Sequence, residues 1–310
     1  MPGIARVTLV LEQALNGLQF GVMLFLMAAG LTLVFGIMNL VNLAHGSFYM
    51  VGASAAAWVG IRTNSFVLGL LAGIAAATAV GVATETTVLR RFYRRDHLDQ
   101  VLATFGLILF FNEAVAMLFG RQPLFASIPK ALGGAVQIVP GLHYSVYRLM
   151  IIVAGVVVAA ALYILINGTR LGMLVRAGAT NRDMVRALGV RIRLLYTAVF
   201  GLGALLAGLA GALIGPLLSV EVGMGDRILI ITFVVIVIGG IGSVRGALFG
   251  ALLVGMVDTM ARAFLPNLLQ LFMRTSDADA VGAGIASMAI FVLMAVVLLI
   301  RPRGLFPAHG

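Results

Sequence analysis

Nine apolar segments, separated by short polar interruptions, constrain the fold of this 310-residue chain more than any other feature. Hydrophobic residues make up 62% of the chain and charged residues only 10%, a combination that excludes a soluble globular domain of this length. Because about 20 apolar residues span a bilayer core, the chain has room for roughly eight to ten membrane-crossing helices. We therefore predict an all-α, polytopic integral membrane protein. The segments are residues 14–36, 41–60, 66–88, 100–119, 149–167, 194–214, 228–242, 247–264 and 283–300.

The positive charges between these segments predict the orientation, since cytoplasmic loops carry the excess of Lys and Arg. Thirteen of the 21 positive residues fall on one side: Arg90, Arg91, Arg94, Arg95, Arg170, Arg176, Arg182, Arg186, Arg191, Arg193, Arg245, Arg301 and Arg303. The other eight are Arg6, Arg62, Arg121, Lys130, Arg148, Arg227, Arg262 and Arg274. The heavier side predicts the cytoplasm, with the N-terminus outside and the C-terminus inside.

The sequence contains no motif that predicts an enzyme. It has no Gly-x4-Gly-Lys-[Ser/Thr] loop for ATP, no Gly-x-Ser-x-Gly elbow and no His-Glu-x-x-His zinc motif. There are no cysteines, and His45 has no second ligand at metal-binding spacing, so we expect neither a metal nor another cofactor. The net charge of +10 lies in loops between spans and does not indicate nucleic-acid binding. If ATP powers this protein, another chain binds it.

Residues 168–193 form a polar island with six arginines between two apolar segments. Thr180 with Asp183 resembles a capping box, and Gly189 is placed to stop a helix. The pattern predicts a helix of about eight residues, roughly 12 Å long, between Thr180 and Gly189.

That short helix would carry two stripes. Met184 and Leu188 are four residues apart and would form an apolar stripe, and Arg182 with Arg186 would form a basic one. A helix this short is only marginally stable alone in water, so we expect another protein surface to cover its apolar face. One interpretation is a docking helix for a cytoplasmic subunit. The other is a surface loop whose arginines only set the topology.

A second polar interruption follows the first apolar segment. Asn39, Asn42 and His45 are three residues apart and would share a helix face, and Gly46 and Ser47 follow directly. Polar groups at membrane depth usually face a cavity or a partner helix. The five residues are therefore candidates for the translocation path, or they form a structural hydrogen-bonded cluster at a helix end.

Small residues at four-residue spacing predict close helix packing. The interpretations are packing within the chain or a subunit interface. The candidate glycines are Gly208, Gly211, Gly242, Gly246 and Gly250.

Three carboxylates lie in apolar segments, where a proton-coupled carrier would need them. Asp258 has Arg262 four residues on, so the pair is expected to neutralise itself on one helix face. Glu85 is expected to reach water near the cytoplasmic end of its segment. For Glu113, next to Asn112, the sequence shows neither a nearby positive charge nor access to water.

Several motifs together resemble the permease subunits of branched-chain amino acid ABC transporters, the LivH type. They cover nearly the whole chain in the order of that family: residues 30–47, 52–53, 172, 176–177, 181, 184, 188–189, 200–213, 239–243 and 246–247.

The resemblance implies one transmembrane permease domain over residues 1–310 in a bacterial inner membrane, with a cytoplasmic coupling loop at 168–193. It implies four partners besides membrane lipid and a small-molecule solute: a second related permease, two cytoplasmic ATPase subunits and a periplasmic solute-binding protein. ATP binding in such importers pulls the coupling helices together and switches the path between outward- and inward-facing. The residues implied in ATPase coupling are Gly172, Arg176, Ala177, Thr180, Asn181, Asp183, Met184, Arg186, Leu188 and Gly189.

The solute stays open, because similar permeases move branched-chain or other amino acids, amides or urea, and the binding protein supplies most of the selectivity. Two other functions also stay open at this point. One is a secondary carrier of small polar solutes, proton-coupled through Glu113. The other is a non-enzymatic scaffold or channel subunit.

Overall fold

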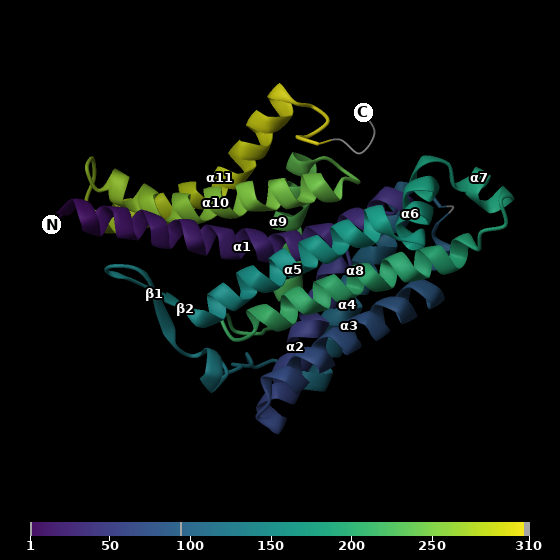
Figure 1. Cartoon of the computed structure of the whole chain (residues 1–310), viewed down its shortest axis with the longest axis horizontal. Helices are drawn as coiled ribbons and strands as arrows, with labels where there is room; N and C mark the ends of the chain where they lie inside the picture. The colour runs from purple at the N-terminus through teal and green to yellow at the C-terminus, as the bar shows by residue number, and fades with distance from the viewer. Residues whose placement is uncertain (1, 94, 307–310) are drawn as a thin grey trace.

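The computed structural model describes residues 2–93 and 95–306, with side chains for residues 7–93, 95–181 and 183–306 (Figure 1). Arg94 and the side chains of Arg6 and Arg182, which the sequence assigned to the topology and to the basic stripe, lie outside this description. The elements are α1 (Pro2–Met38), α2 (His45–Thr63), α3 (Phe66–Thr87), η1 (Leu89–Arg91), α4 (His97–Phe119), η2 (Lys130–Leu132), β1 (Ala135–Val139), β2 (Leu142–Ser145), α5 (Val146–Gly168), α6 (Arg170–Thr180), α7 (Arg182–Ala187), α8 (Ile192–Ile214), α9 (Met224–Gly239), α10 (Val244–Leu269) and α11 (Thr275–Ile300).

The all-helical membrane fold predicted from the sequence is confirmed. Within the described ranges, seven helices are long and apolar enough to cross a bilayer: α1, α3, α4, α5, α8, α10 and α11. This number is slightly below the expected eight to ten. The other two apolar segments form α2, which carries several polar residues, and α9, whose 16 residues extend only about 24 Å.

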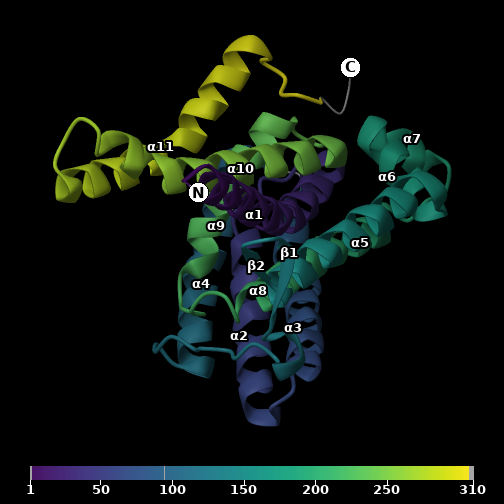
Figure 2. The same ribbon diagram turned by 60° about the vertical axis from the view of Figure 1, so that its left-hand side comes forward.

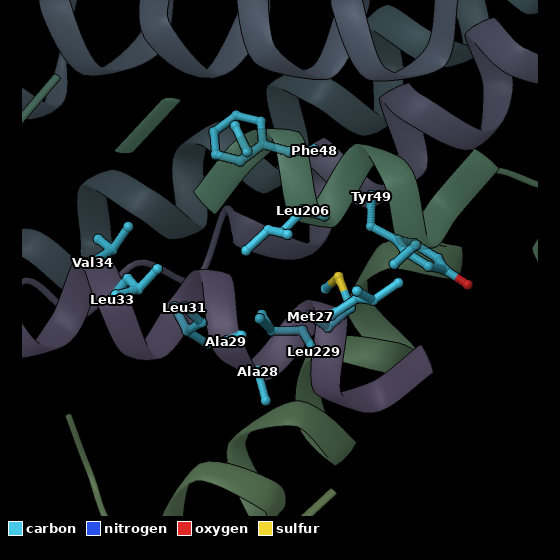
Figure 3. Close-up of a cluster of buried hydrophobic side chains, with 14 of the residues drawn as sticks. Met27, Ala28, Ala29, Leu31, Leu33, Val34, Phe48, Tyr49, Leu206 and Leu229 are labelled. Atoms are coloured by element: carbon cyan, nitrogen blue, oxygen red, sulfur yellow. The ribbon is translucent and has the colours of Figure 1, made fainter. Parts of the chain in front are cut away.

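Helix α1 lies at the centre of the molecule, antiparallel to α10 (Figure 1). A Cβ on Gly21 would lie 2.9 Å from Leu252 Cα, and one on Gly30 would lie 2.8 Å from the carbonyl oxygen of Gly203. These glycines let α10 and α8 approach the backbone of α1, as small residues do between membrane helices. The core surrounds this contact, and Figure 3 shows Met27, Tyr49, Leu206 and Leu229 from α1, α2, α8 and α9 side by side in it.

Helices α2, α3, α4 and α8 form a group that extends away from α1 and α10 (Figure 2). Added side-chain atoms would clash with Ala77 of α3 at Gly208, and with the Tyr49 carbonyl of α2 at Gly211. Gly246 and Gly250 instead face α9, where a Cβ on Gly250 would lie 2.7 Å from the Val235 carbonyl oxygen. All four glycines thus contact other helices of the same chain, whereas the fifth candidate, Gly242, lies in the turn before α10 with φ +82 and not on a helix face.

Two features were not predicted. A small antiparallel sheet of β1 and β2 precedes α5, and the basic segment that follows α5 contains two helices, α6 and α7, rather than one. Because they flank α5, whose 23 residues extend about 35 Å, the sheet and α6 lie at opposite ends of the bundle (Figure 1).

Candidate functional site

Helix α7 projects from one end of the bundle as a single short turn-and-a-half (Figure 1). The side-chain Oδ1 of Asn181 accepts a hydrogen bond from the Met184 N–H at 2.9 Å, so Asn181 is the N-cap. The prediction of Thr180 as the cap is wrong, because Thr180 is the last residue of α6 and donates its hydroxyl to the Arg176 carbonyl. Gly189 has φ +85, the left-handed conformation that ends a helix there as predicted.

The apolar stripe of α7 is open. Met184 is 59% exposed and Leu188 is 76% exposed, whereas Val185 between them is buried against the bundle. Asp183 and Arg186 are also exposed. Helix α7 is therefore anchored on one face and presents apolar and charged groups on the other.

Helix α6 is tied to the end of α5 by close backbone contacts. The Thr169 hydroxyl caps α6 by accepting from the Gly172 N–H, and any side chain on Gly172 would collide with the carbonyls of Leu165 and Ile166. Arg176 donates to the Ile166 carbonyl. Arg176 thus acts as a cap on α5, whereas its neighbour Ala177 is exposed.

Two adjoining cavities connect α6 to the C-terminal end of α1. One of about 480 Å³ lies between α1, α5, α6 and α10, and one of about 470 Å³ lies beside it. Both are lined by Gly36 and Ile37 of α1, by Ala179 and Thr180 of α6, and by Gly242, which has φ +82. The basic segment and the break after α1 therefore share one interior surface.

The break between α1 and α2 folds back into the bundle. Asn39 takes a left-handed φ of +49, and Asn42 Oδ1 accepts from the Ala44 N–H at 3.1 Å. A Cβ on Gly30 would lie 3.1 Å from His45 Cε1. Because Gly30 lies eight residues before the end of α1, α2 begins about 12 Å back along α1 from that end. Helix α2 is thus discontinuous with α1 and starts inside the molecule.

Several polar atoms at this break are buried without a hydrogen-bond partner among the described residues. They are Thr32 Oγ1, Asn42 Nδ2, His45 Nε2 and Ser47 Oγ. The three candidates Asn42, His45 and Ser47 are thereby brought together in the interior, whereas Asn39 is exposed. The fifth, Gly46, packs directly against Gly225, so the N-termini of α2 and α9 meet here.

The three membrane carboxylates have different surroundings. The expectation that Glu85 reaches water is wrong: its side chain is 0% exposed and accepts from Arg90, Tyr93 and Thr197. Arg90 lies in η1 and Tyr93 just after it, whereas Thr197 comes from α8, 112 positions along the chain, which spacing alone could not reveal. Asp258 pairs with Arg262 at 2.9 Å, as the four-residue spacing predicted.

Glu113, on α4, has an ion-pair partner that the sequence did not reveal. It accepts from Arg121 at 2.7 Å, and the side chains are 55% and 73% exposed. Its neighbour Asn112 instead donates to Asp226 at 3.1 Å. The carboxylate that motivated a proton-coupled carrier is an exposed surface ion pair.

Sequence reasoning also missed a polar cluster beside Asp258, at the end of the bundle opposite α7. Asn16 Oδ1 accepts from Arg148 at 2.7 Å and from the Tyr144 hydroxyl at 3.2 Å. Gln19, one turn further along α1, is buried. The signal was available, because polar residues at 13, 16 and 19 recur every three positions in an apolar segment and share one helix face.

Comparison with known protein families identifies the family of this chain. The profile of the family described as "Branched-chain amino acid transport system / permease component" matches residues 13–300. No solved structure matches the chain significantly.

Three curated relatives show the range of similar proteins. The high-affinity branched-chain amino acid transport system permease protein BraD of Pseudomonas aeruginosa is 30% identical, and the alignment covers 95% of each chain. The corresponding permease protein LivH of Escherichia coli K12 is 28% identical over 95% of this chain and 94% of its own. The ribose import permease protein RbsC of the same strain is 29% identical over 75% of this chain and 72% of its own.

Proposed function

This chain belongs to the branched-chain amino acid transport permease family, and we propose that it is the membrane subunit of an ATP-driven importer for branched-chain or related amino acids. It would form the translocation path, while ATP is hydrolysed on partner chains. The partners would be a second related permease, two cytoplasmic ATPase subunits and a periplasmic binding protein.

The observation that carries the proposal is the exposed face of α7. Met184 and Leu188 are apolar and open at one end of the bundle, and Arg186 lies beside them. An apolar anchor with a basic rim suits a protein surface with a groove and acidic groups around it. We assign that surface to an ATPase subunit, which puts α7 in the cytoplasm, the N-terminus outside and the C-terminus inside.

The cavities around α6 offer a route from α7 to the path. Gly178 of α6 lies against Ile37 of α1, where a Cβ would be 3.7 Å from the Ile37 side chain. Displacement of α7 by an ATPase would therefore be passed through α6 to the break at residues 39–44. Rigid-body movement of packed elements is the usual repertoire of such switches.

The unpartnered polar atoms at the break support two alternating states. A buried polar group without a partner costs about 1–3 kcal/mol. Asn42, His45 and Ser47 would recover this cost in a conformation that opens the break to water or solute. We therefore assign these residues to the translocation path and the structure to a closed state.

The Arg186→Glu change tests the docking role. Transport by the reconstituted complex should be lost and the ATPase subunits should no longer co-purify, since the change reverses a charge at the exposed face. Helical content and membrane insertion should stay unchanged. Arg170→Glu is the matched control, because it makes the same charge change at an exposed position on α6.

A second measurement uses the absence of native cysteines. A single cysteine at Leu188, carrying a photo-crosslinker, should capture a Walker-A-bearing ATPase in native membranes. Uptake that survives Arg186→Glu, together with no ATPase adduct at Leu188, would overturn the coupling assignment.

A further inference from the structure

Two adjoining cavities lie at the end of the bundle opposite α7. The larger, about 430 Å³, is an open depression between α1, α5 and α10, and the polar residues along it are Gln13, Asn16, Gln19, Arg148, Asp258, Thr259 and Arg262. The smaller, about 210 Å³, has a largely apolar lining that includes Met23, Tyr49, Ile214, Leu217 and Ile228. Gln19, Phe20 and Arg148 line both cavities, so a polar chamber and an apolar chamber share a wall.

Asp258 is a half-satisfied carboxylate in the polar chamber. Its side chain is 8% exposed, and Oδ2 accepts from Arg262 at 2.9 Å. Oδ1 is buried and has no hydrogen-bond partner among the described residues. A buried anionic oxygen without a donor is costly, and once a rotation of the Asp258 side chain exposes it, an ammonium group, with three N–H donors, would satisfy it.

Arg148 supplies the opposite charge at the wall between the chambers. Its Nη1 donates to Asn16 Oδ1, and within the described ranges no carboxylate lies at salt-bridge distance from it. A guanidinium has five N–H donors in a planar fork that matches a carboxylate. Arg148 therefore has donors left for an anionic group.

We infer that the paired cavities bind an α-amino acid as a zwitterion. Asp258 holds the α-ammonium, Arg148 holds the α-carboxylate, and an aliphatic side chain enters the apolar chamber beside Met23 and Ile228. The inference rests on the proposed function and adds a site within the permease itself.

Protection of a single introduced cysteine tests the site. Thr259→Cys places a thiol in the polar chamber of a chain with no other cysteine, and a membrane-impermeant maleimide reports whether the chamber is occupied. The complex is kept in its membrane without the binding protein, and the probes are leucine, leucinamide, which lacks the carboxylate, and 4-methylpentanoate, which lacks the ammonium. At a leucine concentration about ten times its Kd, labelling should slow about tenfold, because only empty sites react.

The matched controls separate charge recognition from general occlusion. Both analogues should protect far less than leucine, and Asp258→Asn or Arg148→Gln should remove the protection by leucine. A cysteine at Ser127, which lines a separate cavity between α2, α3 and residues 126–130, should label equally fast with every probe.

The outcomes distinguish the site from the function. Equal protection by all three probes, or unchanged protection in Asp258→Asn, overturns the zwitterion site. Leucine uptake by the complete transporter without any protection overturns the site and leaves the proposed function standing. A complete wild-type transporter that takes up neither leucine nor any other amino acid overturns the proposed function, and the site falls with it.

Discussion

The two buried carboxylates at opposite ends of the bundle differ in how fully the protein satisfies them. Glu85, on the side of α7, receives two hydrogen bonds from Arg90 and one each from Tyr93 and Thr197. Asp258, at the other end, receives one from Arg262 and leaves Oδ1 without a partner. A fully satisfied buried network fixes structure, whereas an open one leaves capacity for a ligand. The difference supports a structural role for Glu85 and the binding role proposed above for Asp258.

Deleting each carboxylate is the strongest test of that comparison. Glu85→Ala should lower the free energy of unfolding by about 2–4 kcal/mol, because it removes the acceptor of the Tyr93 hydroxyl and leaves a buried space unfilled. Asp258→Ala should lower it by about 1 kcal/mol or less, because Arg262 is 52% exposed and can turn to water. Unfolding by SDS in mixed micelles measures both differences. Equal losses for the two variants would remove the distinction between a structural and a binding carboxylate.

A milder change sharpens the structural half of the comparison. Tyr93→Phe keeps the ring that packs edge-on against Tyr196 at 5.3 Å but removes the donor to Glu85. Loss of a hydrogen bond to a charged group should cost about 1.5–3 kcal/mol. Thr86→Val, which removes an exposed hydroxyl that bonds only to its own helix, is a control expected to cost less.

The effect of Tyr93→Phe on stability should also depend on pH. Burial, together with the hydrogen bond to Glu85, raises the pKa of Tyr93 far above its usual range. A raised folded-state pKa contributes stability that is fully present below the unfolded value of about 10 and is lost as pH rises through the folded value. The stability gap between wild type and Tyr93→Phe should therefore stay constant from about pH 6 to 9 and shrink only under strongly alkaline conditions. A gap that closes near neutral pH would contradict the neutral-donor role.

Hydropathy predicted the helices well because each apolar segment had to bury its backbone polar groups within a helix. All nine predicted segments coincide with helices, from 14–36 in α1 to 283–300 in α11. Helix α6 was missed because its apolar and basic residues alternate around a short helix at the surface, where no hydropathy window detects it. The strands β1 and β2 were missed because they are short and largely exposed.

The candidate site was predictable only where the contacts are local. The Asp258–Arg262 pair and the stop at Gly189 follow from spacing within a few residues. The network of Glu85 joins α3 to Thr197 of α8, 112 positions away, and Arg148 meets Asn16 across 132 positions. Such contacts depend on how the helices pack, which the apolar pattern of a single sequence does not specify.

The smallest effect is expected at the third carboxylate, which tests whether burial rather than charge decides the roles above. Glu113→Gln removes an ion pair whose side chains are more than half exposed, so stability should change by about 0–1 kcal/mol. Leucine uptake should be unchanged in rate and in its dependence on pH, because this carboxylate lies at the surface of the bundle, paired with Arg121, and not in its interior. Arg121→Gln is the matched variant and should behave alike. If Glu113→Gln abolished uptake, and the wild-type protein still took up leucine in ATP-depleted vesicles, the protein would instead be a proton-coupled carrier. Glu113, the exposed carboxylate, would then be the residue that carries the proton.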